Sequence, residues 1–348
     1  MDSPETECTF PADKFQLLID VSLTQIHADV ASYDDTIWMV YNIPNEDNQF
    51  DVYLTSFSCE GERIQAPTHI LAIDGENQTT PRVAVTNNRV LVASQGDNGG
   101  NPNLSIHLHV QQFDGTMVSE VKWAPNLSTG NMWLPSVVGT ETGFWIAAAV
   151  ANESHFQTAI QALDFDGQPR AEAEWVGPEE YAVFPNIDAR SDQYIVGWET
   201  GEDSVQYTAG SLGSEVESIE TIQNQAGVKV LFDSNQVFAH QKSPLLLMHN
   251  GSPVSESSNT FYANAASGIE HTLFTYFRLQ SGYENDILYG RISEDGSITK
   301  DILISSDPPV APYRPAVTHI RDDVYFVAWS QGTNPDFEIW GQFIQIEN

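Results

Sequence analysis

A motif that recurs seven times constrains the fold of this 348-residue chain more than any other feature. Its clearest copy begins at Pro315, passes a polar turn at 321–323, and continues through the apolar runs 324–329 and 336–343. The upstream copies follow the same order, more weakly in the last two, and begin at His27, Pro81, Pro135, Pro185, Val228 and Tyr262. A chain built this way repeats one supersecondary unit, and each unit buries its apolar faces against its neighbours.

A set of glycines marks a second register along the repeats. Each follows the third apolar segment of its repeat, and successive members lie 38 to 54 residues apart: Gly61, Gly115, Gly167, Gly213, Gly251 and Gly296. The segments are short, rich in β-branched and aromatic residues, and bounded by turn formers, so they favour strands. A period of about 40 to 50 residues with short strands is typical of β-propellers. We therefore predict an all-β fold, a seven-bladed β-propeller of four-stranded blades; six blades would result if 228–251 were an insertion.

The two ends of the chain predict how the ring closes. The last repeat stops at Asn348 after its third strand, whereas 15–23 is strand-like and belongs to no complete repeat. We expect 15–23 to supply the missing outer strand of the last blade, which leaves no loose edge between the first and last blades. The predicted organisation is an N-terminal tail at 1–14 followed by a single propeller over 15–348.

The charge balance excludes one class of partner. Lys and Arg total 14 against 48 Asp and Glu, which gives a formal net charge of −34. Proteins bind phosphate backbones with Lys and Arg, so we predict no nucleic-acid binding. The same field disfavours anionic membranes and acidic polysaccharides. No apolar run approaches the ~20 residues of a membrane span. Cations, neutral sugars and basic protein surfaces remain open as ligands, and the oligomeric state stays undetermined.

The cysteines and the N-terminus bear on the cellular compartment. Cys8 and Cys59 are either free thiols or one disulfide that would pin the tail to the first repeat. They lack the clustered spacing of a zinc site. The segment 1–10 is acidic and polar, unlike a signal peptide. We expect a mature exported domain without its leader, in an extracellular, cell-surface or periplasmic setting.

The best-formed repeats resemble a known group of proteins. The stretch 283–296 contains Asp286-Ile-Leu-Tyr-Gly-Arg followed by Asp295-Gly296, and 326–343 contains Val-Ala-Trp and Ile-Trp-Gly. These phrases resemble the Pro-x-Val-Ala, Val-Val-x-Trp, Asp-x-Ile-Tyr-Gly-x-Arg and Asp-Gly repeats of secreted bacterial seven-bladed β-propeller proteins. The resemblance spans most of the chain and is strong in the last two repeats. It implies a propeller and an exported setting but no defined activity, since such repeats are mostly uncharacterised binding or adhesion modules.

The loops are expected to divide unequally between the two faces of the disc. Two connections in each repeat are tight, at pairs such as Asn87-Asn88 and Asn250-Gly251. The other two are long, and strand alternation places all the long ones on one face, where a rigid scaffold would present binding residues. Aromatic residues there fit a sugar or a protein surface, or else pack inward between blades. The candidate ligand-binding residues are Trp123, Trp133, Tyr181, Tyr283, Tyr313, Arg82 and Arg314.

Metal sites are only weakly indicated. Asp47 and Asp97 lie in Asn- and Gly-rich loops and could bind Ca²⁺ through hard oxygens, although neither loop matches a full calcium motif. No other cofactor is indicated. Four repeats carry Asp where the third strand begins, namely Asp51, Asp203, Asp286 and Asp336. These are either a ring of ligands or, as we favour, side chains that cap local turns.

No motif identifies catalysis. The chain lacks a Gly-x-Ser-x-Gly elbow and a phosphate-binding loop. Among 48 acidic residues a pair of glycosidase carboxylates can always be chosen, so such a pair has little predictive value. We expect a lectin-like binding or adhesion propeller that recognises a glycan or a protein on its long-loop face. The alternatives are a carbohydrate-active enzyme, glycosidase or lyase, with its site at the channel mouth, and a structural subunit of an envelope assembly.

Overall fold

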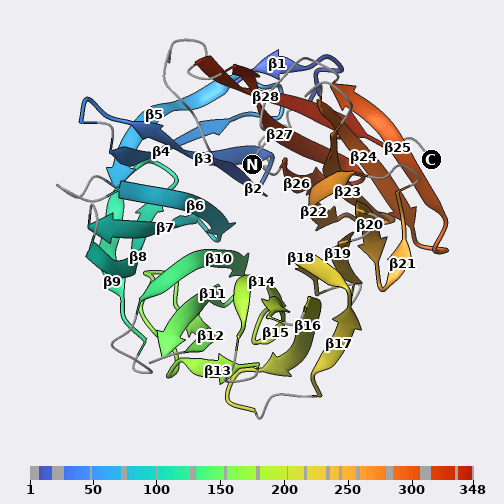
Figure 1. Cartoon of the computed structure of the whole chain (residues 1–348). Coiled ribbons are helices and arrows are strands. Elements are labelled where there is room, and N and C mark those ends of the chain that lie inside the picture. Colours follow the sequence, from blue (N-terminus) through green and yellow to red (C-terminus); the bar gives the residue numbers. More distant parts are fainter. Residues whose placement is uncertain are drawn as a thin grey trace.

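Seven antiparallel sheets of four strands each form a closed ring around a central channel (Figure 1). The computed structural model describes residues 8–17, 27–47, 49–71, 77–98, 101–125, 131–152, 155–177, 181–201, 203–214, 218–232, 236–242, 245–255, 259–279, 285–305, 315–333 and 336–346. The predicted seven-bladed propeller is confirmed. The weak fifth repeat is a complete blade, so the six-bladed alternative is wrong. No helix in this described part of the chain is long and apolar enough to cross a membrane.

The blades follow one another in chain order. Blade 1 contains β2 (Ala28–Tyr33), β3 (Thr36–Pro44), β4 (Phe50–Phe57) and β5 (Arg63–Leu71). Blade 2 contains β6 (Asn77–Thr86), β7 (Arg89–Asn98), β8 (Asn101–Gln112) and β9 (Met117–Trp123). Blade 3 contains β10 (Met132–Thr140), β11 (Gly143–Asn152), β12 (His155–Leu163) and β13 (Glu174–Val176). Blade 4 contains β14 (Val183–Arg190), β15 (Gln193–Thr200), β16 (Ser204–Ser211) and β17 (Glu220–Gln223).

The remaining blades complete the ring. Blade 5 contains β18 (Gln225–Leu231), β19 (Gln236–Lys242), β20 (Leu245–His249) and β21 (Ser252–Pro253). Blade 6 contains β22 (Thr260–Ser267), β23 (His271–Leu279), β24 (Asn285–Ser293) and β25 (Ile298–Ser305). Blade 7 contains β26 (Ala316–Arg321), β27 (Val324–Thr333), β28 (Asp336–Gln345) and β1 (Phe15–Gln16). In every blade the first strand in this order lies innermost (Figure 1).

The N-terminal segment closes the ring as predicted. β1 pairs antiparallel with β28, with Phe15 opposite Gly341, and so forms the outer strand of blade 7. Of the predicted closing segment 15–23, residues 18–23 lie outside the described residues. The predicted tail also takes part in the fold: the ring of Phe10 packs against that of Phe343, with 5.4 Å between the ring centres and a tilt of 51° between their planes. A disulfide joins Cys8 to Cys59 in blade 1, with their Cα atoms 5.9 Å apart.

Local chain conformation explains the glycine register. The six marker glycines all have φ between 72° and 86°, a left-handed conformation that favours glycine. Two of the tight turns between first and second strands use paired Asp or Asn instead. Asp34 and Asp35 have φ of 46° and 60°, and Asn87 and Asn88 have 38° and 62°. Two positive φ values in a two-residue hairpin match a type I′ turn, whose twist suits the flanking strands.

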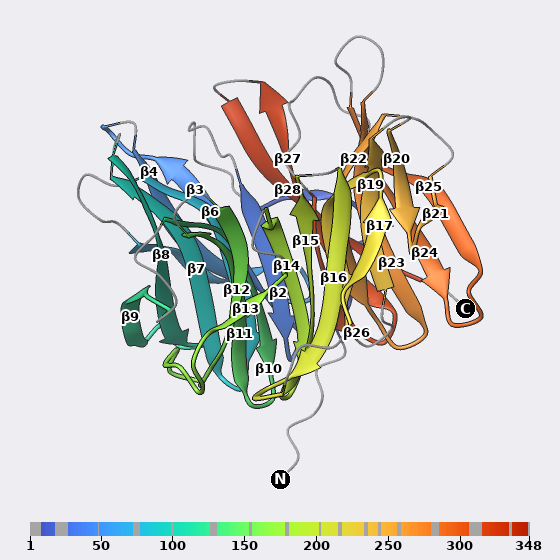
Figure 2. The same ribbon diagram turned by 60° about the horizontal axis from the view of Figure 1, so that its bottom comes forward.

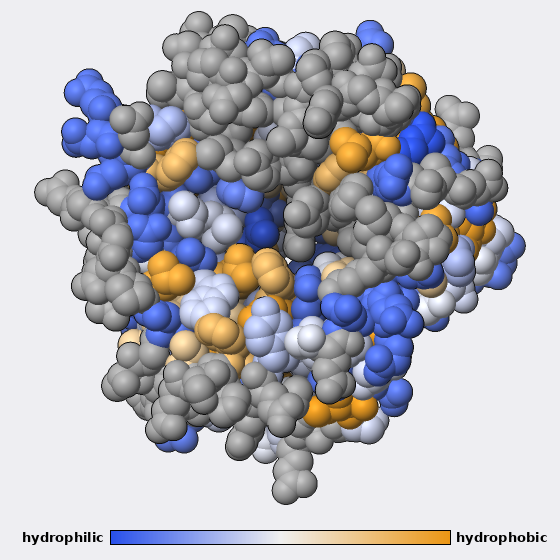
Figure 3. Space-filling view, viewed as in Figure 1, coloured by the Kyte–Doolittle hydropathy of each residue, from blue (hydrophilic) through white to orange (hydrophobic). Residues whose placement is uncertain are grey.

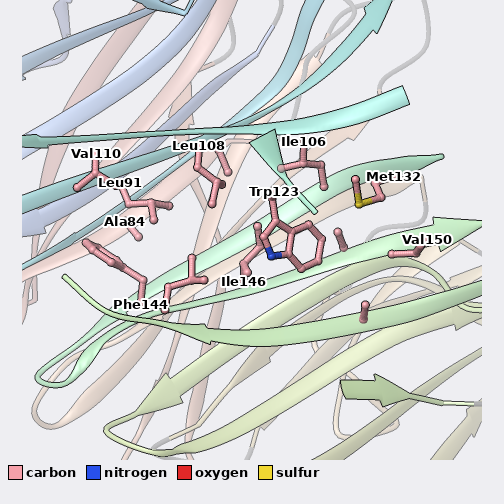
Figure 4. Packing of buried hydrophobic residues seen from close by; sticks show 14 residues of the cluster. Ala84, Leu91, Ile106, Leu108, Val110, Trp123, Met132, Phe144, Ile146 and Val150 are labelled. Carbon is pink, nitrogen blue, oxygen red and sulfur yellow. The ribbon is translucent and has the colours of Figure 1, made fainter. Parts of the chain in front are cut away.

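The core is divided among the junctions between blades. In the described residues the buried hydrophobic side chains form seven clusters, and each cluster combines two neighbouring blades. Figure 4 shows the cluster between blades 2 and 3. Successive residues of β3 alternate between junctions: Met39 packs toward blade 7, whereas Trp38 and Val40 pack toward blade 2. The second strand is therefore apolar on both faces, which is why it reads as a continuous hydrophobic run.

Candidate functional site

The second-to-third and blade-to-blade connections lie on one face of the disc, as predicted, but the expected lengths are corrected. On this face β7 ends at Asn98 and β8 begins at Asn101, whereas on the opposite face β12 ends at Leu163 and β13 begins only at Glu174. Each first strand starts at this face, so the second-to-third loops and the blade-to-blade connections both fall there, opposite the tight turns (Figure 2). We call it the long-loop face, and the opposite side the tight-turn face. Binding residues concentrate on loops held by a rigid scaffold, which makes the long-loop face the place to look for a site.

Most of the innermost strands have a β-bulge near their first residues, at the long-loop face. Five of them, β6, β10, β14, β18 and β22, shift register near their start, as β-bulges do. Within these shifts Thr80, Leu134, Phe184 and Gly227 have φ of 47°, 56°, 53° and 67°. Three of the four are not glycine, and bulky or β-branched residues rarely adopt this conformation. Strained backbone held at equivalent places on one face often accompanies a functional surface.

The preceding blade supports two of these bulges with side-chain acceptors. Gln95 Oε1 accepts a hydrogen bond from the backbone N–H of Leu134 at 3.1 Å. Glu199 Oε1 accepts one from the N–H of Gly227 at 2.7 Å. Both acceptors lie on second strands, β7 and β15. A donor freed by the register shift is thus satisfied across the blade junction, which fixes the mouth of the channel rigidly.

Aromatic side chains from blades 3 and 4 gather on the long-loop face. The Trp133 ring lies 4.6 Å from that of Phe156 and meets it edge-on. The Phe156 ring in turn lies 5.8 Å from that of Tyr181, again edge-on. Tyr181 is 39% exposed and nearby Phe184 is 42% exposed. We call Trp133, Phe156, Tyr181 and Phe184 the aromatic group; Figure 3 shows apolar and weakly polar surface over β10 and β14 beside the channel.

A groove between blades 4 and 5 borders the same region. It encloses about 530 Å³ and is lined largely by polar side chains: Asp203, Gln223, Asn224, Gln225 and Gln241. Gln225 is only 3% exposed, and its Oε1 has no hydrogen-bond partner among the described residues. The groove and the aromatic group lie close together: a Cβ atom built on Gly201 would lie 3.4 Å from the Tyr181 ring, and Asp203, two residues on, lines the groove.

The central channel is small, and polar side chains make up part of its lining. It encloses about 110 Å³, room for several water molecules but less than ligand pockets usually offer. All seven innermost strands line it. Its polar lining residues are Asp29, Arg82, Ser136, Asn186, Lys229 and Asn264. Asp29 is the one carboxylate among these described lining residues, and its Oδ2 accepts the Val83 N–H at 3.1 Å.

The structure separates the predicted ligand-binding residues into groups. Trp133 and Tyr181 come together in the aromatic group, and Arg82 lines the channel. Trp123 is 3% exposed, because it packs between blades 2 and 3 and donates its indole N–H to Gln161 Oε1 at 2.6 Å. It therefore offers no surface to a ligand, and its expected place on the face is corrected. The remaining candidates, Tyr283, Tyr313 and Arg314, lie outside the described residues.

The two aspartates predicted for calcium lie in neighbouring blades. Asp47 is exposed in a turn organised by Asn45, whose Oδ1 accepts the N–H groups of Asp47 and Gln49 at 3.0 Å. Asp97 Oδ1 accepts a hydrogen bond from Asn77 Nδ2 at 3.0 Å. In the described part of the chain, neither aspartate belongs to a group of three carboxylate, imidazole or thiolate ligands. A calcium site at Asp47 or Asp97 stays a prediction.

The aspartates that begin third strands act locally where the structure describes their contacts. Asp51 is 7% exposed, accepts hydrogen bonds from Asn45, and lies 3.4 Å from His69 Nε2. Asp286 is 4% exposed and pairs with Arg278 of the adjoining strand. In the interactions that the structure describes, both contact side chains of their own blade and not the turn amides of the capping interpretation, so that interpretation stays a prediction. The side chain of Asp336 lies outside the described residues.

The acidic groups whose pKa values burial raises most clearly lie away from the channel. Burial raises the pKa of the Glu174 carboxyl, but this residue lies on the outer strand β13. Burial also raises the pKa values of Tyr41, Tyr276 and Tyr325, whose rings fill the junctions between blades. The tyrosine shifts belong to the core, and none of these four groups is among the described residues that line the channel.

Comparisons with known proteins show the fold without assigning a family. No protein-family model matches the chain, and no curated protein is similar to it in sequence. A protein of unknown function from Dyadobacter fermentans is 10% identical with a TM-score of 0.60, over 96% of this chain and 98% of that one. Trypanosoma rangeli sialidase in complex with sialic acid is 9% identical with a TM-score of 0.58, over 96% and 57%. The β-propeller domain of the trilobed protease from Pyrococcus furiosus is 11% identical with a TM-score of 0.53, over 94% and 98%.

These likenesses limit what can be carried over. This chain spans just over half the length of the sialidase it matches. At about 10% identity, similarity of structure says nothing about shared ligands or reactions. The chain is therefore a seven-bladed β-propeller that resembles an uncharacterised bacterial protein and the propellers of sialidases.

Proposed function

We propose that this chain is an exported binding propeller that recognises a neutral glycan on its long-loop face, over blades 3 to 5. The observation that carries the proposal is the aromatic group beside an amide-lined groove. Aromatic rings offer flat apolar surface to the faces of sugar rings, whereas amide side chains donate and accept hydrogen bonds with hydroxyls. The groove, at about 530 Å³, falls within the usual range of ligand sites.

Several features favour a neutral glycan over other ligands. The described side chains of the groove include four amides and one carboxylate, Asp203, and no Lys or Arg. Gln225 Oε1 is buried without a partner, and leaving such an atom unpaired costs about 1 to 3 kcal/mol. The net charge of −34 disfavours acidic sugars, so the sialic acid bound by the structurally similar sialidase is not carried over.

The enzymatic alternative has less support. Acid–base glycosidases place two carboxyl groups on either side of the scissile bond. Among the described residues that line the channel, Asp29 is the one carboxylate, and its Oδ2 already binds a backbone N–H. The narrow channel also leaves little room for a sugar ring. The disulfide between Cys8 and Cys59 supports export, since disulfides persist mainly in oxidising compartments.

A glycan array tests the proposal directly. Purified protein is screened with calcium and again with EDTA, beside the variants Trp133→Ala and Tyr181→Ala. Met117→Ala is the matched control, because Met117 is 62% exposed but lies on outer strand β9. We expect one class of neutral glycan to bind and each aromatic truncation to weaken it by about 2 kcal/mol, roughly 30-fold.

The other outcomes are equally informative. Loss of binding in EDTA would indicate that metal held by the Asp47 or Asp97 loop takes part. Equal binding by the wild type and both aromatic variants would remove the site from the aromatic group. Silence across the array, together with a protein partner captured in a Trp133-dependent way, would replace the glycan with a protein surface.

A further inference from the structure

A compact group of metal-ligating side chains lies on the tight-turn face, where blades 6 and 7 meet. Glu270 comes from the turn before β23, His271 is the first residue of β23, and Asp323 comes from the turn before β27. Their ligand atoms all lie within 4.8 Å of one another. Among the described residues this is the one group of three such side chains. It lies on the face opposite the aromatic group and does not depend on the proposed function.

The geometry leaves two ligand atoms facing each other. Asp323 Oδ1 accepts the backbone N–H groups of Glu270 at 3.3 Å and His271 at 3.2 Å. Its other oxygen, Oδ2, lies 3.2 Å from His271 Nδ1. The two side chains are each only 10% exposed. Although the atoms are close, their orientation does not make a hydrogen bond, so the buried Nδ1 has no hydrogen-bond partner among the described residues. A buried polar atom without a partner calls for an explanation, and an ordered water or an ion is a common one.

In two other blades an arginine pairs with the aspartate at the equivalent turn position and neutralises its charge. Asp35, Asp192 and Asp323 each occupy the second residue of the turn between first and second strands. Asp35 pairs with Arg321 at 3.2 Å, and Asp192 pairs with Arg170 at 2.9 Å. Their side chains are 33% and 51% exposed, against 10% for Asp323. The most buried carboxylate of the three is thus the one with no arginine partner in the described part of the chain.

We propose that a divalent transition-metal ion of the Zn²⁺ class binds between His271 Nδ1, Asp323 Oδ2 and the Glu270 carboxylate. One imidazole nitrogen with two carboxylate oxygens suits zinc and its neighbours, whereas calcium and magnesium prefer oxygen alone. The cation supplies the positive charge that arginine supplies at the other two turns, because burying an unpaired carboxylate is costly. Since its ligands come from two blades, the ion links blade 6 to blade 7.

The surrounding residues hold these ligands in place. The Tyr325 hydroxyl donates to the backbone oxygen of His271 at 2.6 Å, and the Gly268 N–H donates to the same oxygen at 2.8 Å. A Cβ atom at position 268 would lie 2.1 Å from the Tyr325 hydroxyl and 3.1 Å from Asp323 Oδ1. Only glycine fits there, so the turn can approach Asp323 closely. Fixed outer-shell contacts of this kind orient metal ligands.

The test uses full-length protein from which EDTA has removed bound metal. The protein is titrated with zinc in a buffer that contains excess magnesium, which occupies weak oxygen sites on the acidic surface. Calorimetry gives the stoichiometry, and Co²⁺ substitution gives a visible spectrum that reports nitrogen coordination. The variants are His271→Gln and Glu270→Gln. Asp192→Asn is the matched control, because it removes the equivalent carboxylate from an arginine-paired turn.

We expect one saturable equivalent of zinc and a higher melting temperature with metal bound. Both ligand variants should lower the affinity for zinc at least tenfold, since even the loss of a residue that only orients a ligand lowers metal affinity about 10- to 100-fold. Asp192→Asn should leave the affinity unchanged. Glu270 is exposed, so Glu270→Gln keeps the test valid if His271→Gln fails to fold. Zinc binding without saturation, or unchanged in both variants, would overturn the proposal and leave an ordinary His271–Asp323 ion pair.

Discussion

At the residue scale, equivalent positions of the repeat tolerate unequal strain. Apart from Ser191, the tight turns place Asp, Asn or Gly at left-handed φ, which these residues accept easily. The channel mouth instead places Thr80, Leu134 and Phe184 there. Each such residue costs on the order of 1 to 3 kcal/mol. Phe184 is exposed and follows Tyr181 by three residues, so this strained position presents an aromatic side chain at the surface, where the proposed ligand would meet it.

Thr80 offers a direct measurement of this strain. It has φ of 47°, and its hydroxyl is buried without a hydrogen-bond partner. We expect Thr80→Gly to raise the free energy of unfolding by about 1 kcal/mol, because relief of both costs exceeds the added chain entropy of glycine. Thr79→Gly, at a neighbouring position without positive φ, should lower it by a similar amount. A lower urea midpoint for Thr80→Gly would show that the bulge is unstrained.

Buried tyrosines set the stability at alkaline pH. Burial raises the pKa values of Tyr41, Tyr276 and Tyr325 above the ordinary 10.0. The folded protein therefore holds these protons more tightly than the unfolded chain does. Their contribution is complete below pH 10 and is lost as the pH rises above it, since only the unfolded chain can then ionise. We expect the last part of the tyrosinate absorbance, from these three rings, to appear only with unfolding, above about pH 10. Ionisation of all 12 tyrosines in protein that is still folded would contradict this.

At the element scale, the sequence predicted the features that depend on residues close together in the chain. The turn residues, the second-strand apolar runs and the closing segment at Phe15 all have short-range signals. Trp123 was misplaced because its burial depends on Gln161 in the next blade, 38 residues away. The group formed by Glu270, His271 and Asp323 was not predicted for the same reason. Asp323 is 52 residues from His271 and approaches it only when the blades pack. The bulges had one partial signal, the prolines at positions 81, 135 and 185.

The N-terminal element is held by a covalent bond as well as by pairing. β1 contributes only Phe15–Gln16 to its sheet, whereas Cys8 and Cys59 are 51 residues apart in sequence. Closing a loop of that length stabilises the folded state by about 4 kcal/mol through the entropy of the unfolded chain. We expect the Cys8→Ser/Cys59→Ser double variant to lose up to that amount in urea unfolding, and wild type treated with reductant to match it. Equal stability of the variant and oxidised protein would show that strand pairing alone closes the ring.

At the scale of the whole molecule, the blades depend on one another. The described core lies between blades and not within them, so a single blade has no enclosed core of its own. Ring closure by β1 makes the seventh junction equivalent to the others. Rigid closure suits a protein that presents a fixed ligand surface, because little ordering is then needed when the ligand binds.

The net charge of −34 opposes this compact ring, and its effect can be weighed against the local ion pairs. The described Arg–Asp pairs are Arg89–Asp166, Arg170–Asp192, Arg278–Asp286 and Arg321–Asp35, and all but Arg278–Asp286 join partly exposed side chains. Exposed pairs contribute about 0 to 1 kcal/mol each, whereas repulsion acts among 48 acidic groups. Salt shortens the screening length from about 30 Å at 0.01 M to about 8 Å at 0.15 M.

We therefore expect sodium chloride to raise the melting temperature over that range, the opposite of a protein stabilised by surface ion pairs. Tetramethylammonium chloride at equal ionic strength should act similarly, because screening does not require the cation to bind. A larger effect of sodium would indicate specific cation sites on the acidic surface. A melting temperature that falls with both salts would mean that the arginine pairs outweigh the repulsion, and that the acidic residues are arranged more favourably than their number implies.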